Sequence, residues 1–264
     1  MKSTGKAALA ALMLVVSMLA AACSKPAQEP AASPAVALTV SAAASLKGAM
    51  EDIKTAYAVE KPNITVTCNF GSSGSLQQQI EQGAEVDIFF SAAAKQMDAL
   101  EEKGLILEDT RKDILENRIV LVVPEGTSSV KDFSSLSSEA VKKIALGETG
   151  SVPVGQYSEE VLTKLNLMDA IKPKLVYGKD VKEVLTWVET GNADAGMVYE
   201  TDAKASGKVS IIANAPADSH KPVVYPAAVI KASKNIEASK DFMSFLRSEK
   251  AKTIFEKYGF AFII

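Results

Sequence analysis

The sequence predicts an α/β fold of two lobes joined by two hinge strands, with a ligand cleft between the lobes. Short apolar segments alternate with amphipathic ones along most of the chain, which is typical of strands and helices in turn. Two longer apolar segments, 117–124 (NRIVLVVP) and 222–230 (PVVYPAAVI), are suited to cross from one lobe to the other and back. Open α/β sheets bind ligands beyond the carboxyl ends of their strands, so helix N-termini would face such a cleft.

The apolar pattern places each element in order, and we expect mainly parallel sheets. The last helix carries apolar side chains that would pack on the first lobe, among them Phe242, Phe245 and Phe255. The first lobe would comprise residues 38–119 and 225–264, and the second lobe residues 120–224. Strands are expected at 38–41, 64–68, 86–91, 118–123, 143–146, 174–177, 195–199, 209–212 and 223–230, and helices near 46–60, 75–82, 95–103, 111–115, 157–165, 181–190, 200–206 and 235–257.

The composition fits a protein with an ordinary packed core and no nucleic-acid partner. Of 264 residues, 47% are apolar and 23% are charged, which suits one large domain or two smaller ones. The net charge of −3 gives no basic surplus to bind a polyanion, and only 6% of the residues are aromatic, too few for a base-stacking surface.

The N-terminus is typical of an export signal. Lys2 and Lys6 precede an uncharged apolar run over residues 7–22, which we interpret as part of a signal peptide (1–22) and not as a membrane span. The mature protein would therefore be exported. We expect it on the periplasmic side of the membrane.

Cys23 ends the sequence LAAAC, which resembles the lipobox of bacterial lipoproteins. The resemblance implies that Cys23 becomes the lipidated first residue and holds the protein to the membrane, although Ala20 stands where a larger aliphatic residue is usual. Cleavage after an Ala-x-Ala sequence, which would release a soluble protein, is the alternative. Residues 23–37 are rich in Pro, Ala and Ser and would form a flexible tether.

Two serine-containing junctions between a strand and a helix are candidate anion sites. In LTVSAAASLKGAM, Ser45 would be the N-cap of the helix that follows, and in CNFGSSGSLQQQI the hydroxyl of Ser73 and the nearby N–H groups could donate to a ligand. Both patterns also fit ordinary helix caps and turns.

Three more junctions follow the same plan. Val154 lies in a loop, shaped by Pro153 and Gly155, that leads into an expected helix, and it could contribute only its backbone N–H group. Val181 lies at an expected helix start, where backbone N–H groups have no intrahelical partner, and Asp180 is a natural N-cap for this helix. Tyr199 ends a strand of small residues, and its hydroxyl could reach into a cleft. Taken singly, each of the three is as well explained by a loop, a helix start or a core tyrosine.

The order of these motifs resembles one family, the periplasmic molybdate-binding proteins of ABC importers. The resemblance covers nearly everything after the tether. It is carried by AAASL (42–46), FGSSGSL (70–76), VDIFFSA (86–92), VPVGQY (152–157), ADAGMVYETDA (193–203) and ADSHKPVVYPAAVI (217–230).

This resemblance implies the type II periplasmic-binding-protein fold and a tetrahedral oxyanion, molybdate or tungstate, as the ligand. The ligand would be bound by the hydroxyls of Ser45, Ser73 and Tyr199 and by the N–H groups of Val154 and Val181, where Val154 replaces the usual Ala. It further implies an ABC permease and ATPase as partners and no cofactor. We expect a monomer.

A site made only of donors would suit a fully deprotonated dianion. Phosphate keeps a proton near neutral pH, and its O–H group would find no acceptor in such a site. Sulfate or a small organic anion remains an alternative ligand on the same fold.

An exported hydrolase is the enzymatic alternative, and the sequence gives it little support. The single histidine, His220, lies in a polar turn, and there is no G-x-S-x-G sequence. Cys68 lies in an alternating strand pattern that predicts a buried, unreactive thiol, and Asp87 more plausibly ends a strand than binds a cation. We therefore expect no catalytic residue.

Overall fold

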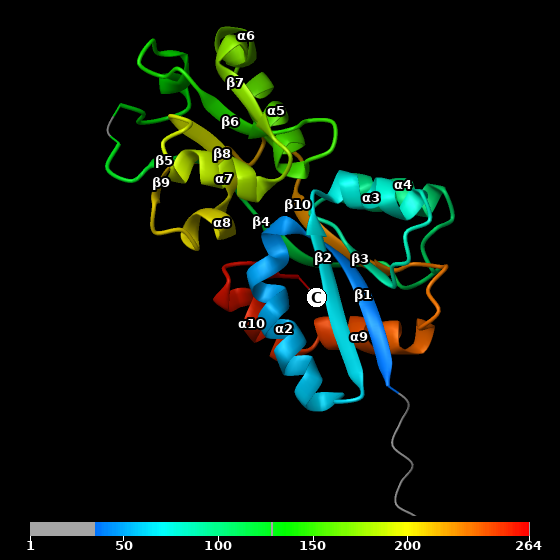
Figure 1. Cartoon of the computed structure of the whole chain (residues 1–264). Coiled ribbons are helices and arrows are strands. Elements are labelled where there is room, and N and C mark those ends of the chain that lie inside the picture. The colour runs from blue at the N-terminus through cyan, green and yellow to red at the C-terminus, as the bar shows by residue number, and fades with distance from the viewer. Residues whose placement is uncertain (1–34, 128, 264) are drawn as a thin grey trace, which may run out of the picture. The chain divides into compact units, whose positions relative to one another are not determined.

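Two β-sheets, each covered by helices, organise the part of the chain that the structure describes (Figure 1). The structure is a computed structural model, and it describes residues 35–127 and 129–263. The predicted signal peptide (1–22), Cys23 and nearly all of the predicted tether lie outside the described residues.

The first sheet has six strands in the order β11-β4-β10-β3-β1-β2. We call this sheet and its helices lobe 1. Its strands are β1 (Val36–Ala43), β2 (Ile64–Gly71), β3 (Ile88–Phe90), β4 (Lys112–Asn117), β10 (Val223–Val229) and β11 (Ala261–Phe262), and its helical elements are η1 (Ala44–Leu46), α2 (Lys47–Glu60), α3 (Ser73–Glu81), α4 (Ala94–Glu102), α9 (Ile236–Leu246) and α10 (Glu249–Lys257).

The second sheet has five strands in the order β7-β6-β8-β5-β9 and, with its helices, forms lobe 2. Its strands are β5 (Ile119–Pro124), β6 (Ile144–Gly147), β7 (Leu175–Gly178), β8 (Ala195–Tyr199) and β9 (Val209–Asn214), and its helical elements are η2 (Ser134–Ser137), α5 (Pro153–Lys164), α6 (Met168–Ile171), η3 (Lys172–Lys174), α7 (Val181–Glu189) and α8 (Glu200–Lys204).

The chain changes sheets where the two long apolar segments were predicted to cross. β4 belongs to the first sheet and β5 to the second, so only Arg118 separates the two lobes there. The chain returns between β9 and β10, through residues 215–222. The predicted two-lobed α/β fold is therefore confirmed, whereas the residue boundaries given above for the lobes stay predictions.

Both sheets are mixed, so the expectation of mainly parallel sheets is wrong. β1 pairs in parallel with β2 and β3, and β6 with β7 and β8. The pairs formed by β10, β4 and β11 in lobe 1 and by β5 in lobe 2 are antiparallel. β4, which leads out of lobe 1, runs in the opposite direction to β10, which leads back into it. These two neighbouring strands therefore pair antiparallel.

Two further predictions about elements are wrong. Residues 111–115 were expected to be helical but belong largely to β4, because β10 and β11 pair with this segment on either side and override its local preference. The helix expected over 235–257 is two helices: α9 ends at Leu246, and the Ser248 side chain accepts a hydrogen bond from Ala251 N–H to cap α10.

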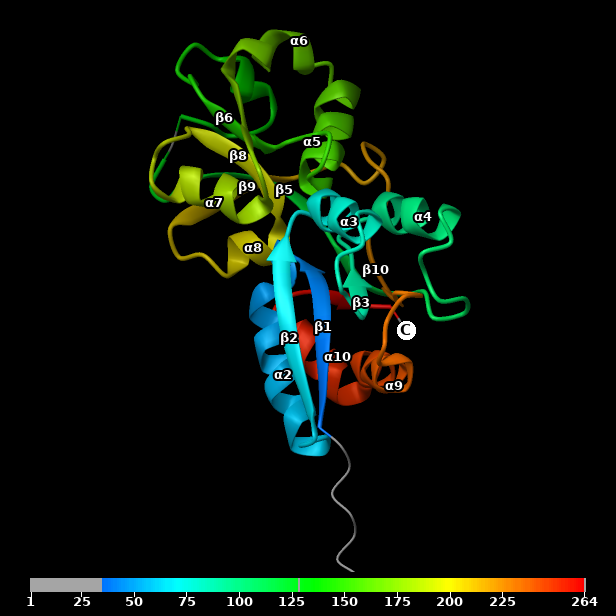
Figure 2. The ribbon, with the colours of Figure 1, turned by 45° about the vertical axis from the view of Figure 1, so that its right-hand side comes forward.

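The helices of lobe 1 cover both faces of its sheet. Successive residues of β3 point to opposite faces: Phe90 contacts Phe255 of α10, with ring centroids 6.1 Å apart, while Phe89 joins a second core cluster with Leu76 of α3 and Leu100 of α4. Figure 2 shows α2 and α10 beside β1 and β2, and α3 near the carboxyl ends of these strands.

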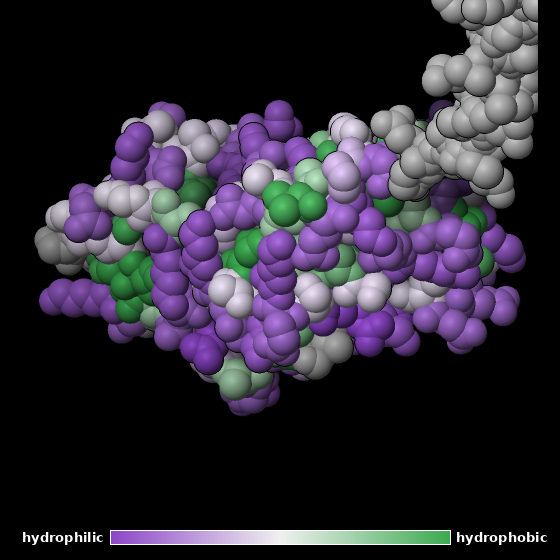
Figure 3. All heavy atoms as spheres, turned by 90° about the horizontal axis from the view of Figure 1, so that it is seen from below, coloured by the Kyte–Doolittle hydropathy of each residue, from purple (hydrophilic) through white to green (hydrophobic). Residues whose placement is uncertain are grey.

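The last two helices pack on lobe 1, as predicted. Phe242 of α9 lies 4.8 Å from the ring of Tyr57 in α2, and Phe245 lies 5.1 Å from it. The face seen in Figure 3 is covered mostly by hydrophilic side chains, with isolated hydrophobic ones between them. No helix within residues 35–127 and 129–263 is both long enough and apolar enough to cross a bilayer.

Replacing Ser248 should destabilise the protein through the N-terminus of α10. Ser248→Ala removes the side-chain cap on Ala251 N–H, so we expect the free energy of unfolding to fall by about 1 kcal/mol in urea titrations. Ser244→Ala, the same change at an exposed position of α9, is the matched control. An equal loss in both variants would show that the cap contributes nothing.

Candidate functional site

A small cavity lies between the two lobes, and residues from both lobes line it. Lobe 1 contributes segments that follow β1, β2 and β3, and lobe 2 contributes segments that follow β6, β7 and β8. The lining residues are Ala43, Ala44, Ser45, Gly71, Ser72, Ser73, Ala92, Val152, Pro153, Val154, Asp180, Val181 and Tyr199.

Parallel pairing explains why these six segments meet. β1, β2 and β3 are parallel neighbours, as are β6, β7 and β8, so within each lobe three strand ends lie side by side. Each end leads into a helix or a turn, which puts helix N-termini on the cavity, as open α/β sheets generally do. The five predicted site residues Ser45, Ser73, Val154, Val181 and Tyr199 all line this one cavity.

Ser45 does not cap a helix, so this part of the prediction is wrong. It lies inside the short turn η1, and α2 begins two residues later without a side-chain cap. The Ser45 Oγ instead lies 3.0 Å from the Tyr225 Oη of β10. The hydroxyl thus contacts β10, and Ser45 lines the cavity.

Ser73 is fully buried at the start of α3, and its oxygen already has a partner. Its Oγ accepts the N–H of Ala92, 2.9 Å away, from the end of β3. The capping role at this helix belongs to Ser72, whose Oγ accepts Ser75 N–H. Because the Ser73 oxygen accepts from the protein, its own proton is free to donate into the cavity.

The two valines contribute backbone N–H groups from helix starts. Val154 is the second residue of α5 and Val181 the first residue of α7, so neither N–H group has an intrahelical acceptor. α5 can begin so near β6 because Gly155 lacks a side chain: a Cβ there would lie 2.0 Å from the Gly147 oxygen. The positive ends of two helix dipoles therefore point at the cavity.

Tyr199 provides the third hydroxyl. It ends β8 with only 2% of its surface exposed, and its Oη makes no hydrogen bond to any described residue. A buried hydroxyl without a partner is costly, so this group is suited to a ligand. Burial raises the pKa of Tyr199 well above its ordinary value, which keeps the phenol protonated and able to donate.

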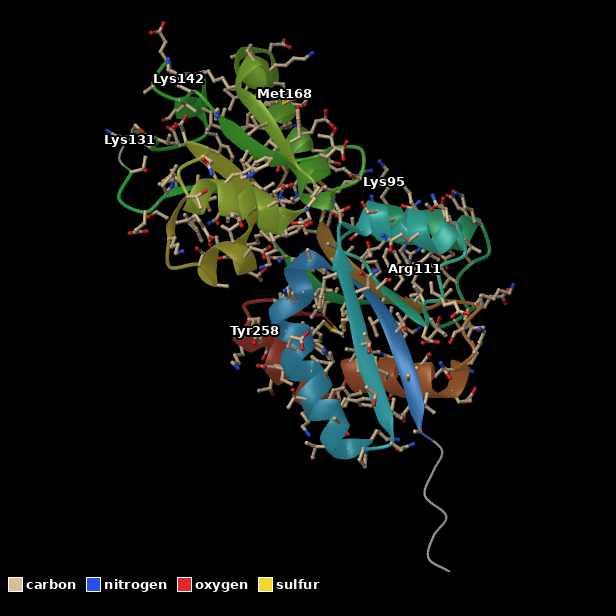
Figure 4. All side chains as sticks on the ribbon, viewed as in Figure 1. Lys95, Arg111, Lys131, Lys142, Met168 and Tyr258 are labelled. Carbon is tan, nitrogen blue, oxygen red and sulfur yellow. The ribbon has the colours of Figure 1, made fainter. Side chains whose placement is uncertain are left out.

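The lining carries no cationic side chain from the described residues. The Lys and Arg side chains labelled in Figure 4, Lys95, Arg111, Lys131 and Lys142, all lie outside it. Asp180 is the one carboxylate in the lining, whereas the sequence predicted a site made only of donors. Its Oδ1 accepts Glu183 N–H at 2.9 Å and so caps α7, as predicted.

The cavity is small. Its volume is about 10 Å³, which is close to the space that a single water requires. Such a volume favours a compact ligand of few atoms over an organic anion with a carbon chain.

The lobes touch directly beside the cavity. The Gly74 N–H of α3 donates to the Ser151 carbonyl oxygen of lobe 2 at 2.9 Å. A Cβ on Gly74 would lie 2.4 Å from that oxygen and 2.7 Å from the Ser151 Cα, well inside van der Waals contact. Only glycine lets the two backbones approach this closely.

The other residues considered from the sequence lie away from the cavity. His220 is half-buried, not fully exposed, and its ring packs edge-on against Tyr157. Burial raises the pKa of the half-buried Cys68 thiol to about 11, as expected for an unreactive group. Asp87 accepts hydrogen bonds from Thr39 N–H and from Asn235, so it is a structural group. Within the described residues, no three His, Cys, Asp or Glu side chains are grouped to hold a metal ion.

Sequence reasoning missed two residues of consequence. Gly74 lies within the quoted motif FGSSGSL, but only the fold shows that it meets Ser151. Tyr225 is the one residue with a polar side-chain atom in the apolar segment 223–230, and this feature of the sequence could have indicated that its hydroxyl has a buried partner.

The family described as bacterial extracellular solute-binding protein matches residues 38–261. This match spans both lobes and every segment that lines the cavity. The chain belongs to this family.

Individual relatives agree with this membership. The chain is 48% identical over 255 residues to YvgL of Bacillus subtilis (strain 168), provisionally named as an ABC transporter substrate-binding lipoprotein, covering 96% of this chain and 95% of that protein. It is 42% identical to the molybdate-binding protein ModA of Haemophilus influenzae, covering 85% of this chain and 89% of that one. The solved periplasmic molybdate-binding protein of Azotobacter vinelandii is 26% identical with a TM-score of 0.75, covering 86% and 99% respectively.

Proposed function

We propose that this solute-binding protein captures molybdate, and also tungstate, outside the cytoplasm and delivers it to the permease and ATPase of an ABC importer. The observation that carries the proposal is the buried cavity between the lobes, in which hydroxyl protons and helix N-termini converge without a cation. The names of the relatives from Haemophilus and Azotobacter support molybdate as the ligand.

The proposed ligand contacts are the hydroxyls of Ser45, Ser73 and Tyr199 and the N–H groups of Val154 and Val181. Hydrogen bonds to a charged group each make a net contribution of about 1.5–3 kcal/mol, so five such donors would contribute much of the binding free energy of a dianion. Backbone N–H groups at helix N-termini are neutral donors that stabilise an anion through their dipoles, and other proteins bind anions in the same way.

The same donors favour a fully deprotonated oxyanion over phosphate. The proton that phosphate retains near neutral pH needs an acceptor, and the only carboxylate in the lining is Asp180, whose Oδ1 caps α7. An unpaired O–H group in a closed cavity costs several-fold in affinity at least.

The remaining parts of the proposal concern location and role. We propose that the protein is held on the periplasmic side of the membrane by a lipid on Cys23, acts as a monomer, and releases its ligand unchanged, so that it is a receptor and not an enzyme. The name of the Bacillus relative supports the lipid anchor.

Calorimetric titration of the purified protein with molybdate, tungstate, sulfate and phosphate tests the proposal. We expect tight one-to-one binding of molybdate and tungstate, far weaker binding of sulfate and no detectable binding of phosphate. Tighter binding of sulfate than of molybdate would contradict the proposed ligand but would still agree with a receptor for an ABC importer. No heat with any of the four would leave an organic anion or an enzymatic substrate as the better proposal.

Removing the Tyr199 hydroxyl should weaken molybdate binding without unfolding the protein. Tyr199→Phe deletes one donor to a charged ligand, so we expect an affinity loss of about tenfold to a hundredfold, measured by calorimetry. The control is Tyr57→Phe in lobe 1, which removes a tyrosine hydroxyl that donates to Asp241 and lies outside the cavity. Equal affinities of the two variants would remove Tyr199 from the site.

A side chain at residue 74 should oppose closure while leaving every donor in place. Gly74→Ala puts a Cβ against Ser151 of the other lobe, so we expect molybdate affinity to fall at least tenfold and the radius of gyration with molybdate, from X-ray scattering, to exceed that of the unmodified protein. Gly150→Ala is the control, because a Cβ there meets nothing within 4 Å. Unchanged affinity in Gly74→Ala would mean that binding does not need this contact.

A further inference from the structure

Tyr225 lies behind the cavity and contacts one of its donors. It belongs to β10, has no exposed surface and does not line the cavity itself. Its Oη is 3.0 Å from the Ser45 Oγ and 3.2 Å from the Asn117 Nδ2. Three polar groups thus form a line from Asn117 at the end of β4, through Tyr225, to Ser45.

Chemistry fixes the direction of donation at the Asn117 end of this line. The Asn117 Oδ1 accepts the N–H of Arg118 at 2.9 Å, which identifies the other amide atom as nitrogen, and an amide nitrogen only donates. The Tyr225 oxygen therefore accepts from Asn117. Burial raises the pKa of Tyr225 well above its ordinary value, so its own proton stays in place and is available to Ser45.

Once Ser45 accepts from Tyr225, its own proton is the one left for the cavity. Ser73 is arranged in the same way, with Ala92 N–H as its donor. The two serines come from different strand ends: Ala92 N–H donates to the Ser73 oxygen, and the Tyr225 hydroxyl lies within hydrogen-bond distance of the Ser45 oxygen and can donate to it. Both hydroxyls are thereby set to donate to a ligand.

The line also joins the two lobes. The Asn117 Nδ2 donates a second hydrogen bond, 2.9 Å long, to the Thr201 Oγ1 of α8 in lobe 2. Thr201 follows the ligand-facing Tyr199 by two residues. Asn117 is the last residue before the chain crosses at Arg118, so the amide lies where the lobes would hinge.

We propose that Asn117 and Tyr225 are positioning residues, which hold the Ser45 proton toward the cavity through a hydrogen-bond relay that crosses the hinge. The proposal rests on the function proposed above, because the relay matters only if Ser45 donates to an anion. The relay makes Ser45 a donor before the ligand arrives, and it occupies a lone pair that could otherwise accept the proton of hydrogen phosphate.

A double-mutant cycle tests whether Tyr225 acts through Ser45. Tyr225→Phe preserves the shape of the side chain and removes only the hydroxyl, so we expect molybdate affinity to fall about tenfold, which corresponds to about 1.4 kcal/mol. In the Ser45→Ala background the same change should have almost no effect, because the group that it orients is gone. Tyr57→Phe, which removes a buried hydroxyl outside the cavity, is the matched control.

Selectivity gives a readout that a merely structural role would not change. We expect the ratio of molybdate to phosphate affinity to narrow in Tyr225→Phe, because the Ser45 oxygen regains an acceptor site. The relay would be overturned if Tyr225→Phe lowered molybdate affinity equally in the wild-type and Ser45→Ala backgrounds and left the ratio of molybdate to phosphate affinity unchanged. Tyr225 would then be a packing residue.

A measurement without ligand separates the relay from the proposed function. In protein labelled with ¹³C at the tyrosine ζ carbon, the signal missing from Tyr225→Phe identifies Tyr225. We expect this signal to shift in Ser45→Ala and in Asn117→Ala and to stay in place in Ser244→Ala, an exposed change. No shift in the first two variants overturns the relay even if molybdate binds. If molybdate fails to bind while the shifts occur, the relay stands and the proposed ligand is wrong.

Discussion

Holding a multiply charged anion without a countercharge requires that every group around it present a proton. The five proposed donors in the cavity of this protein meet that requirement by different routes. The Ser73 oxygen accepts from Ala92 N–H, the Ser45 oxygen would accept from Tyr225 in the proposed relay, and burial keeps the proton on Tyr199. The valine N–H groups can only donate. The direction of hydrogen bonding, more than the number of polar atoms, therefore defines what the cavity can bind.

This constraint explains several features of the surrounding fold. The parallel halves of the two sheets supply six strand ends and thus the helix starts, while the antiparallel halves carry the crossing strands. Buried hydroxyl protons keep their direction only if their partners are fixed, and β10 fixes one of them by placing Tyr225 behind Ser45. Small residues such as Ala43, Ala44 and Ala92 line the cavity and leave their backbone close to it.

The sequence predicted the two-lobed fold and the five lining residues, because each of these residues stands where a strand passes into a helix and because the order of the motifs resembles one family. That local pattern can be read from the sequence without knowing how the two lobes are arranged. The helix expected over 111–115 failed because β10, more than a hundred residues away in the chain, pairs with it. The partner of Ser45 was likewise out of reach: Tyr225 is 180 positions distant, and no local pattern reports such a contact.

The hydrogen bond from Gly74 to Ser151 has a consequence for observing the protein at work. Its amide proton is shielded while the lobes touch and is open to solvent when they part. Exchange of this one proton for deuterium would therefore proceed at a rate proportional to the fraction of time spent open. This single backbone site would therefore report the fraction of molecules whose lobes are apart, with no label attached to either lobe.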